Sequence, residues 1–432
     1  MTPSPARASA KTPLTQNQIR GFWASWGGWA LDGMDSFIYA LVLVPAMKEL
    51  LPQSGIPATQ SAIGYYGGLL FALFLVGWGF AFLWGPIGDR FGRVRTLTLT
   101  ILCYSLFTFL GAVSTNIWQL AIFRLLAGLG IGGEWTLGGI LVAEEWPENR
   151  RVSGAGFMHT GYYFGIFLAA IANYTIGVHF GWRAMFILGG TPALLVSLIR
   201  YGVKEPEKWK SKANALRGGF FEPMRALFSA TLRGRTLLNS IYLLISMTGL
   251  WAGSVYVPSS VTALAARAGY DAASAARLAS WGTMILSAGT IAGCLLVAPL
   301  AERIGRRATL AFFFVLMFLS IAFGFGSIFY WKENALPWFF VTLALLGVGG
   351  ANFAVYTLWL PEQYPTECRA SAFAFATSIG RFVAAGVTFL VGAAVAQYQT
   401  IGTPVAWTSV AFLAGLLLLP LGFETKGKDL PA

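Results

Sequence analysis

Two aspartates inside a long apolar run are the residues best suited to carry chemistry in this chain. Asp32 and Asp35 stand three residues apart, so a helix presents both carboxylates on one face. A charged side chain costs roughly 2.5 to 3.5 kcal/mol at the centre of a membrane helix, so it needs a partner or a use. Asp35 lies about 14 residues into its predicted helix, near the middle of a bilayer. We predict that Asp35 carries a proton.

Arg124, in another apolar run, is the expected partner of Asp35. A carboxylate that gains and loses a nearby cation can bind and release a proton near neutral pH. The alternative is a permanent ion pair that only locks two helices together. Asp32 either shares the proton or lies in a solvated vestibule. Glu134 either joins the same proton-coupling group or ties its helix to a neighbour.

Arg381 is the residue that points most directly to a substrate. It lies deep in a predicted helix of the second half, where no acidic residue occurs in any predicted helix interior. The guanidinium fork matches a carboxylate or phosphate bidentately. We therefore predict that Arg381 binds an anionic substrate. The alternative is that Arg381 reaches an acid of the first half, such as Asp32, and acts as a gate.

Aromatic side chains outnumber amides in the helices that should line a central cavity. Sugar sites usually need amides, which both donate and accept hydrogen bonds, yet no glutamine occurs between Gln119 and Gln363. Each ring alone is more often packing or an interfacial anchor. Together with Arg381, they favour a small planar organic anion. The candidates are Tyr39, Tyr162, Tyr163, Trp251, Tyr256, Asn352 and Tyr356.

The composition identifies the class of protein that must position these groups. Of 432 residues, 56% are hydrophobic and 11% are charged, whereas soluble domains carry about 25% charged residues. This composition is typical of an all-α integral membrane protein. A span needs about 20 apolar residues, so the chain has room for about twelve transmembrane helices.

We predict two pseudo-symmetric six-helix bundles, at 21–201 and 235–422, joined by a central loop at 202–234. Residues 1–20 and 423–432 are predicted as tails, the first of them disordered. The spans are expected near 21–47, 61–87, 96–115, 118–144, 152–177, 182–201, 235–262, 276–300, 308–330, 337–360, 370–395 and 402–422.

Two pairs of charged motifs indicate that the halves repeat one design. Residues 88–93 (GDRFGR) recur 213 residues later as 301–306 (AERIGR), and the Glu-X-X-Pro motif at 144–147 recurs at 362–365. Such repeats are typical of transporters built from related bundles. We predict that these charges join helix ends in one conformation and separate in another. The gating candidates are Asp89, Arg90, Arg93, Glu144, Arg151, Glu302, Arg303, Arg306, Glu362 and Arg369.

The basic residues predict the orientation in the membrane. The side that carries both tails and the central loop has 23 Lys and Arg, and the opposite side has five. Both termini and the central loop are therefore expected in the cytoplasm. This asymmetry also explains the net charge of +12, which favours contact with anionic lipid over a nucleic-acid partner.

No cofactor or metal site is expected. The two histidines, His159 and His179, are isolated from Cys and from paired carboxylates. No nucleophile–base pair is apparent, so the chain is not predicted to be an enzyme. The three cysteines support no disulfide scaffold.

Residues 85–95 resemble the loop motif between helices 2 and 3 of the major facilitator superfamily, and the resemblance extends over the whole chain. Residues 143–151, 361–369, 204–207 and 423–427 are similar to motifs of its sugar-porter branch and relatives. Asp32-Gly33-Met34-Asp35 resembles the Asp-Gly-aromatic-Asp signature of aromatic-acid:proton symporters, with Met34 in place of the aromatic residue. The run from Arg124 to Pro147 resembles sialate and metabolite:proton symporters.

This resemblance implies the twelve-helix major facilitator fold, a monomer in the cytoplasmic (inner) membrane, and the pairing of a helix 1 Asp with a helix 4 Arg. We expect a secondary active transporter that imports a small organic anion with protons by alternating access. Alternatives are a proton-coupled sugar or polyol symporter and a proton-coupled drug exporter. A non-transporting membrane receptor is the alternative from another class.

Asp89→Asn should shift the balance between inward-open and outward-open states without changing substrate preference, because Asp89 acts in a charge network at helix ends. Site-directed labelling of the two openings, beside competition by a substrate panel, measures both quantities. A variant that changes specificity but not the conformational balance would contradict this role.

Overall fold

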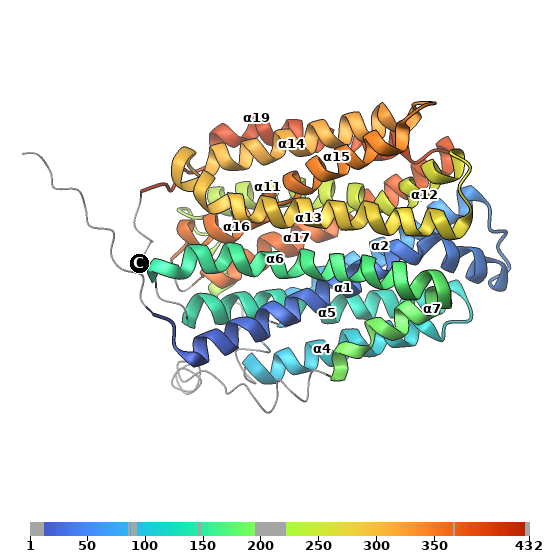
Figure 1. Cartoon of the computed structure of the whole chain (residues 1–432). Coiled ribbons are helices and arrows are strands. Elements are labelled where there is room, and N and C mark those ends of the chain that lie inside the picture. Colours follow the sequence, from blue (N-terminus) through green and yellow to red (C-terminus); the bar gives the residue numbers. More distant parts are fainter. Residues whose placement is uncertain are drawn as a thin grey trace, which may run out of the picture.

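The computed structural model describes residues 13–84, 87, 93–145, 148–194, 222–365 and 368–427. Every regular element in these ranges is a helix. Nine stretches of the described residues are long and apolar enough to cross a membrane. The predicted all-α membrane architecture is confirmed, and Figure 1 shows long helices running side by side.

The described helices of the first half group into six passes through the bundle. Its elements are α1 (Gln16–Gln53), α2 (Gln60–Gly79) with η1 (Phe80–Leu83), α4 (Arg93–Ala112), α5 (Ile117–Glu145), α6 (Glu148–Ala172) with the π-helical η2 (Asn173–Gly177), and α7 (Val178–Gly189) with η3 (Thr191–Leu194).

The described helices of the second half also group into six passes, which follow the short α10 (Glu222–Ala226). Its elements are α11 (Arg233–Ser254) with α12 (Val257–Arg267), α13 (Ala272–Ile304), α14 (Arg306–Gly326) with η4 (Ile328–Tyr330), α15 (Ala335–Gly350) with α16 (Asn352–Trp359) and η5 (Pro361–Gln363), α17 (Arg369–Tyr398), and α18 (Gly402–Trp407) with α19 (Val410–Leu418) and η6 (Leu419–Leu421).

Local chemistry explains where the helices differ from the predicted spans. The first helix begins at Gln16 and not near residue 21, because the Thr15 side chain and Gln18 form a capping box. The span expected at 235–262 is broken between α11 and α12, where Pro258 cannot donate to the carbonyl of Ser254. Gly181 lies between the predicted spans 152–177 and 182–201, and its φ of 81° interrupts the helical backbone there.

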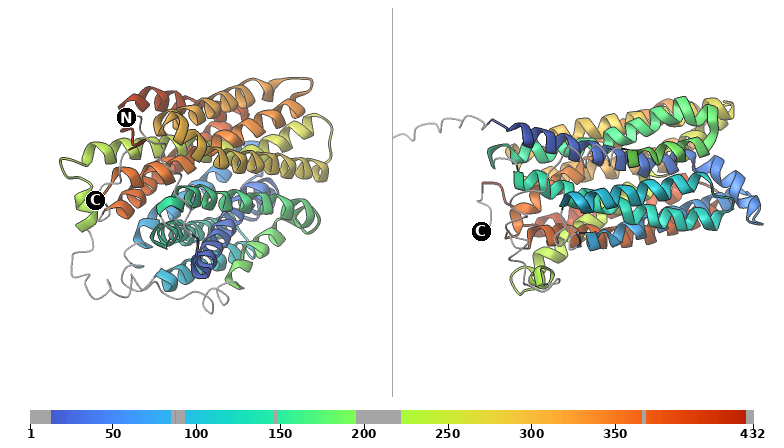
Figure 2. Two further views of the ribbon diagram at one scale, coloured as in Figure 1. Left: turned by 60° about the vertical axis from the view of Figure 1, so that its left-hand side comes forward. Right: turned by 90° about the horizontal axis from the view of Figure 1, so that it is seen from below.

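The two halves meet along two helix pairs. α2 packs against α17, and α6 packs against α13. Figure 1 shows α6 and α13 side by side at the boundary, with α14, α15 and α19 on one side and α1, α4 and α7 on the other. Figure 2 shows the same two groups from other directions. We call the end at which α1 begins and η6 finishes the tail end, and the opposite end the far end.

Small and polar residues close the contact between the halves at the far end. A Cβ on Gly392 of α17 would lie 2.9 Å from the backbone oxygen of Gly64 and 2.9 Å from Cα of Gly68, both in α2. Asn173 Nδ2 donates to Ser280 Oγ over 2.9 Å, which joins η2 to α13. Backbones approach this closely only where side chains are absent. The described structure is therefore closed at its far end.

Gly392→Ala should open the far end, because the new methyl group collides with the α2 backbone only when the halves are closed there. Spin labels at Gln60 and Gln397, which are exposed at the far ends of α2 and α17, should report a longer distance. Gly386→Ala is the matched control, since a Cβ on Gly386 meets nothing within 4 Å. Equal distance distributions in the two variants would contradict the packing argument.

Candidate functional site

The first charged centre lies inside the first half. Asp35 of α1 is 0% exposed and Arg124 of α5 is 1% exposed. The two charges act on each other, although the carboxylate and the guanidinium form no direct hydrogen bond. The guanidinium carbon of Arg124 lies 4.1 Å from the ring centroid of Phe74 and 5.0 Å from that of Tyr39. These two rings offset part of the lost hydration of the cation.

Gly189 and Thr108 form the wall behind the Asp35 carboxylate. A Cβ on Gly189, at the end of α7, would lie 3.0 Å from Asp35 Oδ1 and 2.6 Å from Thr108 Cγ2 of α4. The absence of a side chain at Gly189 leaves room for the carboxylate. Asp35 therefore faces α4, α5 and α7, which all belong to the first half.

The second charged centre joins both halves. Arg381 of α17 is 3% exposed, and its guanidinium carbon lies 4.4 Å from the ring centroid of Trp78 in α2. The Trp78 ring meets Trp251 of α11 edge-on, with centroids 5.4 Å apart, and lies 6.3 Å from Tyr162 of α6. One aromatic ring thus faces the buried cation, and rings from two further helices pack against that ring.

Tyr162 connects the two centres. Its hydroxyl is within electrostatic range of Arg381, of Asp32 and of Asp35. Asp32 is 0% exposed, so the buried carboxylates of α1 and the arginine of α17 share one buried phenol as neighbour. An event at either centre changes the field at this hydroxyl.

The other predicted substrate residues are dispersed. Tyr39 donates to Gly67 O over 3.1 Å and faces Arg124. Tyr163 donates to Gly350 O over 3.3 Å, and Asn352 Nδ2 donates to Gly349 O over 2.9 Å. Tyr356 donates to Tyr242 O over 3.0 Å, inside the second half, and the Tyr256 hydroxyl lies beside the far-end glycines. Of the seven candidates, only Tyr162 and Trp251 have a described ring contact with Trp78, the ring that faces Arg381.

Trp78 and Phe74 were not among the residues predicted from the sequence. Trp78 stands between two glycines that mark close helix approach: a Cβ on Gly77 would lie 2.0 Å from Leu125 O, and one on Gly79 would lie 2.7 Å from Phe382 Cε1. A tryptophan flanked by two such contacts is held in one position. That flanking pattern is the one signal in the sequence that could have singled out Trp78.

The repeated motifs form a charge cluster at the tail end of the second half. Arg306 donates to both carboxylate oxygens of Glu362, from Nε over 2.9 Å and from the terminal nitrogen over 2.6 Å. Thr425 also donates to Glu362. Glu302 and Arg303 are exposed, and the Arg303 carbonyl accepts from Lys426 Nζ over 2.8 Å. The gating role of this cluster stays a prediction.

The structure does not describe the side chains of the remaining gating and proton-coupling candidates. Asp89 and Arg90 lie outside the described residues. For five further candidates the backbone is described but the side chain is not: Arg93, Glu134, Glu144, Arg151 and Arg369.

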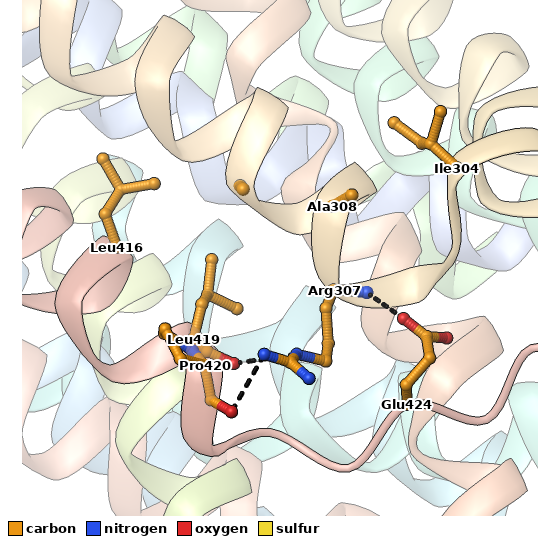
Figure 3. Close-up of a pocket in the computed structure, with 8 residues that line it drawn as sticks. Ile304, Arg307, Ala308, Leu416, Leu419, Pro420 and Glu424 are labelled. Atoms are coloured by element: carbon orange, nitrogen blue, oxygen red, sulfur yellow. Dashed lines mark hydrogen bonds between the residues drawn. The ribbon is translucent and has the colours of Figure 1, made fainter.

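A groove between α14 and α19 is a separate feature at the tail end. It measures about 350 Å³ and has mostly apolar walls, among them Ile304, Ala308 and Leu416. Figure 3 shows Arg307 among the lining residues, with its guanidinium donating to Leu419 O and Pro420 O. None of the residues around Arg381 lines it, so it is not part of the charged centres.

No group of three metal-ligating side chains occurs in the described part of the chain.

The sequence matches two family models. The model described as Major Facilitator Superfamily matches residues 26–281, and the model described as Sugar (and other) transporter matches residues 240–420. Together the two matches extend over both bundles.

Three curated relatives align with nearly the whole chain. A putative metabolite transport protein of Haemophilus influenzae is 30% identical, over 93% of this chain and 95% of its own length. A probable 4-methylmuconolactone transporter of Cupriavidus pinatubonensis is 29% identical, over 95% and 91%. A niacin transporter of Acinetobacter baylyi is 27% identical, over 97% of each chain.

The solved xylose transporter of E. coli, in a partially occluded inward-open conformation, is similar in fold. The TM-score is 0.76 at 18% identity, with 96% of this chain and 100% of the other covered. This likeness confirms the predicted fold and, at such low identity, carries no further than the fold.

Glu424→Gln should destabilise the tail-end cluster by about 1 kcal/mol. Burial raises the pKa of Glu424, but backbone N–H donors from Arg306, Lys426, Arg307 and Thr425 outweigh burial and hold the pKa below 4.5. A lowered pKa in the folded state stabilises the fold above pH 4.5, and the contribution is lost as the pH falls through the folded pKa.

Thermal unfolding in detergent at several pH values checks this prediction. The wild type should unfold at a higher temperature than Glu424→Gln near pH 7, and the two curves should converge as the pH falls below 4.5. Glu302→Gln, at an exposed position, is the control and should match the wild type throughout. A difference between Glu424→Gln and the wild type that is independent of pH would contradict the assignment.

Proposed function

Because the chain belongs to the Major Facilitator Superfamily of transporters, we propose that it imports a small planar organic anion together with protons. The half of the chain that carries Asp35 and the half that carries Arg381 rock against each other around the buried centres. The side with the tails, which is rich in Lys and Arg, faces the cytoplasm of an inner-membrane monomer.

The observation that carries this proposal is the setting of Arg381. The Arg381 guanidinium is 3% exposed and lies with one face against the Trp78 ring, so its N–H groups point outward in the plane of the fork. A carboxylate can meet the edge of the fork with two parallel hydrogen bonds. The rings of Tyr162 and Trp251 stand close enough to contact a flat group attached to the carboxylate. A planar anion can therefore pair its carboxylate with the Arg381 guanidinium and pack its flat group against the Tyr162 and Trp251 rings.

Asp35 is the residue that binds and releases the proton in this mechanism. Protonation neutralises the carboxylate and weakens its attraction to Arg124, whose guanidinium is then held mainly by Phe74 and Tyr39. The change in field is felt at the Tyr162 hydroxyl, which also borders Arg381. Protonation at one centre and anion binding at the other thus act on a shared neighbour, which supports coupling of the two events.

The names of the relatives support an organic acid as substrate. One relative is named for niacin, an aromatic carboxylic acid, and another for 4-methylmuconolactone. The sugar alternative draws on the sugar-transporter model and on the xylose transporter. Against it, the side chains packed at the Arg381 centre are Trp78, Trp251 and Tyr162, and none of these three is an amide.

Internal pH in proteoliposomes that contain a pH dye tests the proposal. Nicotinate, cis,cis-muconate and xylose are added outside, beside protein-free vesicles that report passive entry of weak acid. We expect protein-dependent acidification with a carboxylate, lost by at least about tenfold in Asp35→Asn. Arg381→Gln should abolish uptake of the carboxylate, whereas Arg277→Gln, at an exposed arginine of the same half, should not. Acidification with xylose alone would overturn the anion proposal.

A further inference from the structure

The helix α4 has an unusual distribution of polar residues for a membrane span. Its outward face is apolar: Leu99, Leu102, Leu106 and Phe109 are between 41% and 53% exposed. Its inward face should be equally apolar if packing were its only task. Instead, five hydroxyl side chains face the interior of the first half and none is more than 2% exposed, namely Thr96, Thr100, Tyr104, Ser105 and Thr108.

These hydroxyls follow the axis of α4 from one end toward Asp35. Thr96, Thr100, Tyr104 and Thr108 are spaced four residues apart, so neighbours lie on adjacent turns of one face. At 1.5 Å per residue, the row is about 18 Å long. Thr96 lies in the first turn of α4, at the tail end, and Thr108 lies next to Asp35. The row thus runs from the first turn of α4, at the tail end, to the buried carboxylate.

Thr108, the last hydroxyl of the row toward the far end, lies next to the carboxylate of Asp35, which we propose binds the proton. The Thr108 hydroxyl acts electrostatically on the Asp35 carboxylate, and both side chains border the same gap in front of Gly189. A residue with a side chain at Gly189 would fill this gap.

Several of these hydroxyls have hydrogen-bonding capacity to spare. Thr100 donates to Leu97 O over 2.8 Å, as hydroxyls in membrane helices commonly do. The hydroxyl oxygens of Thr96 and Ser105 are buried and have no hydrogen-bond partner among the described residues. Buried polar groups without a protein partner are the sites at which internal water binds. A row of such groups provides positions for bridging water molecules.

We propose that the hydroxyl row of α4, defined as Thr96, Thr100, Tyr104, Ser105 and Thr108, is a proton route between Asp35 and the tail end. The route is separate from the substrate centre, because α4 packs against α5, α7 and η3 of its own half. The proposal rests on the proposed proton coupling. Each hydroxyl or bridging water accepts one proton and passes on another. Asp35 therefore loses one proton and water at the tail end gains one.

The route gives the proton a path that the substrate does not share. Arg381 lies on α17, and Trp78, Tyr162 and Trp251 lie on α2, α6 and α11. The hydroxyl row lies on α4 and meets α1 at Asp35. Asp35 can then release its proton toward the tail end while the anion still occupies the other centre. The proton and the anion then leave by separate paths, so neither has to wait for the other to leave a shared cavity.

The test compares proton movement with substrate exchange in the same vesicles. Thr100→Val and Ser105→Ala remove one hydroxyl each with little change in volume. The probe is nicotinate or cis,cis-muconate, whichever acidifies wild-type vesicles. Acidification should slow by about tenfold or more. Exchange of labelled for unlabelled probe across the membrane, which needs no net proton movement, should stay within about twofold of wild type.

Two further variants separate a proton route from a structural role. Thr98→Val removes a hydroxyl from α4 at a half-buried position off the row and should leave both rates unchanged. Thr100→Ser retains the hydroxyl and should restore acidification. Thermal unfolding in detergent verifies that each variant is folded.

Three results would overturn the proposal. Row variants that acidify as fast as the wild type would show that the hydroxyls carry no proton. A parallel loss of exchange, or the same loss in Thr98→Val, would show that they only support packing. A wild type that exchanges the probe with no proton signal would instead refute the proposed proton coupling, and with it the need for a route.

Discussion

The burial of two arginines is the constraint on which the rest of this bundle depends. A guanidinium loses most of its hydration inside a membrane protein, and aromatic faces or opposite charges must offset that loss. Phe74 faces Arg124 and Trp78 faces Arg381. These two rings are four residues apart on α2, so they occupy one side of one helix on successive turns. α2 therefore contacts both buried cations, one from its own half and one from the other.

The charged residues could be found from the sequence because their cost is visible there. Asp32, Asp35, Arg124 and Arg381 interrupt apolar runs, and all four are buried. The rings around them could not be found in this way. Trp78 stands in a run of apolar residues, and the side of α2 that meets Arg381 depends on how the two bundles dock. That docking depends on close contacts such as those of Gly392 with Gly64 and Gly68, which join residues more than 300 positions apart in the sequence and so leave no local pattern.

Hydrogen bonds to the backbone set a second limit on prediction. The repeated motifs led to Arg306 and Glu362, since opposite charges at matching positions are visible in the sequence. Glu424 gave no such signal, because its carboxylate accepts from backbone N–H groups of Arg306, Arg307 and Lys426. Helix breaks were foreseeable only where proline or glycine dictates the backbone, as at Pro258. The π-helical turn at Asn173–Gly177 has no comparable marker.

The contact between Trp78 and Arg381 has a consequence for the energetics of the whole molecule. The Trp78 ring and the Arg381 guanidinium belong to different halves, so their contact exists only while the two halves are packed together. Separating the halves replaces an aromatic face with water around a single guanidinium. Closing the bundle is thus, in part, the dehydration of one cation. Any solute that changes the hydration of that cation changes the conformational equilibrium as well, whether or not it is transported.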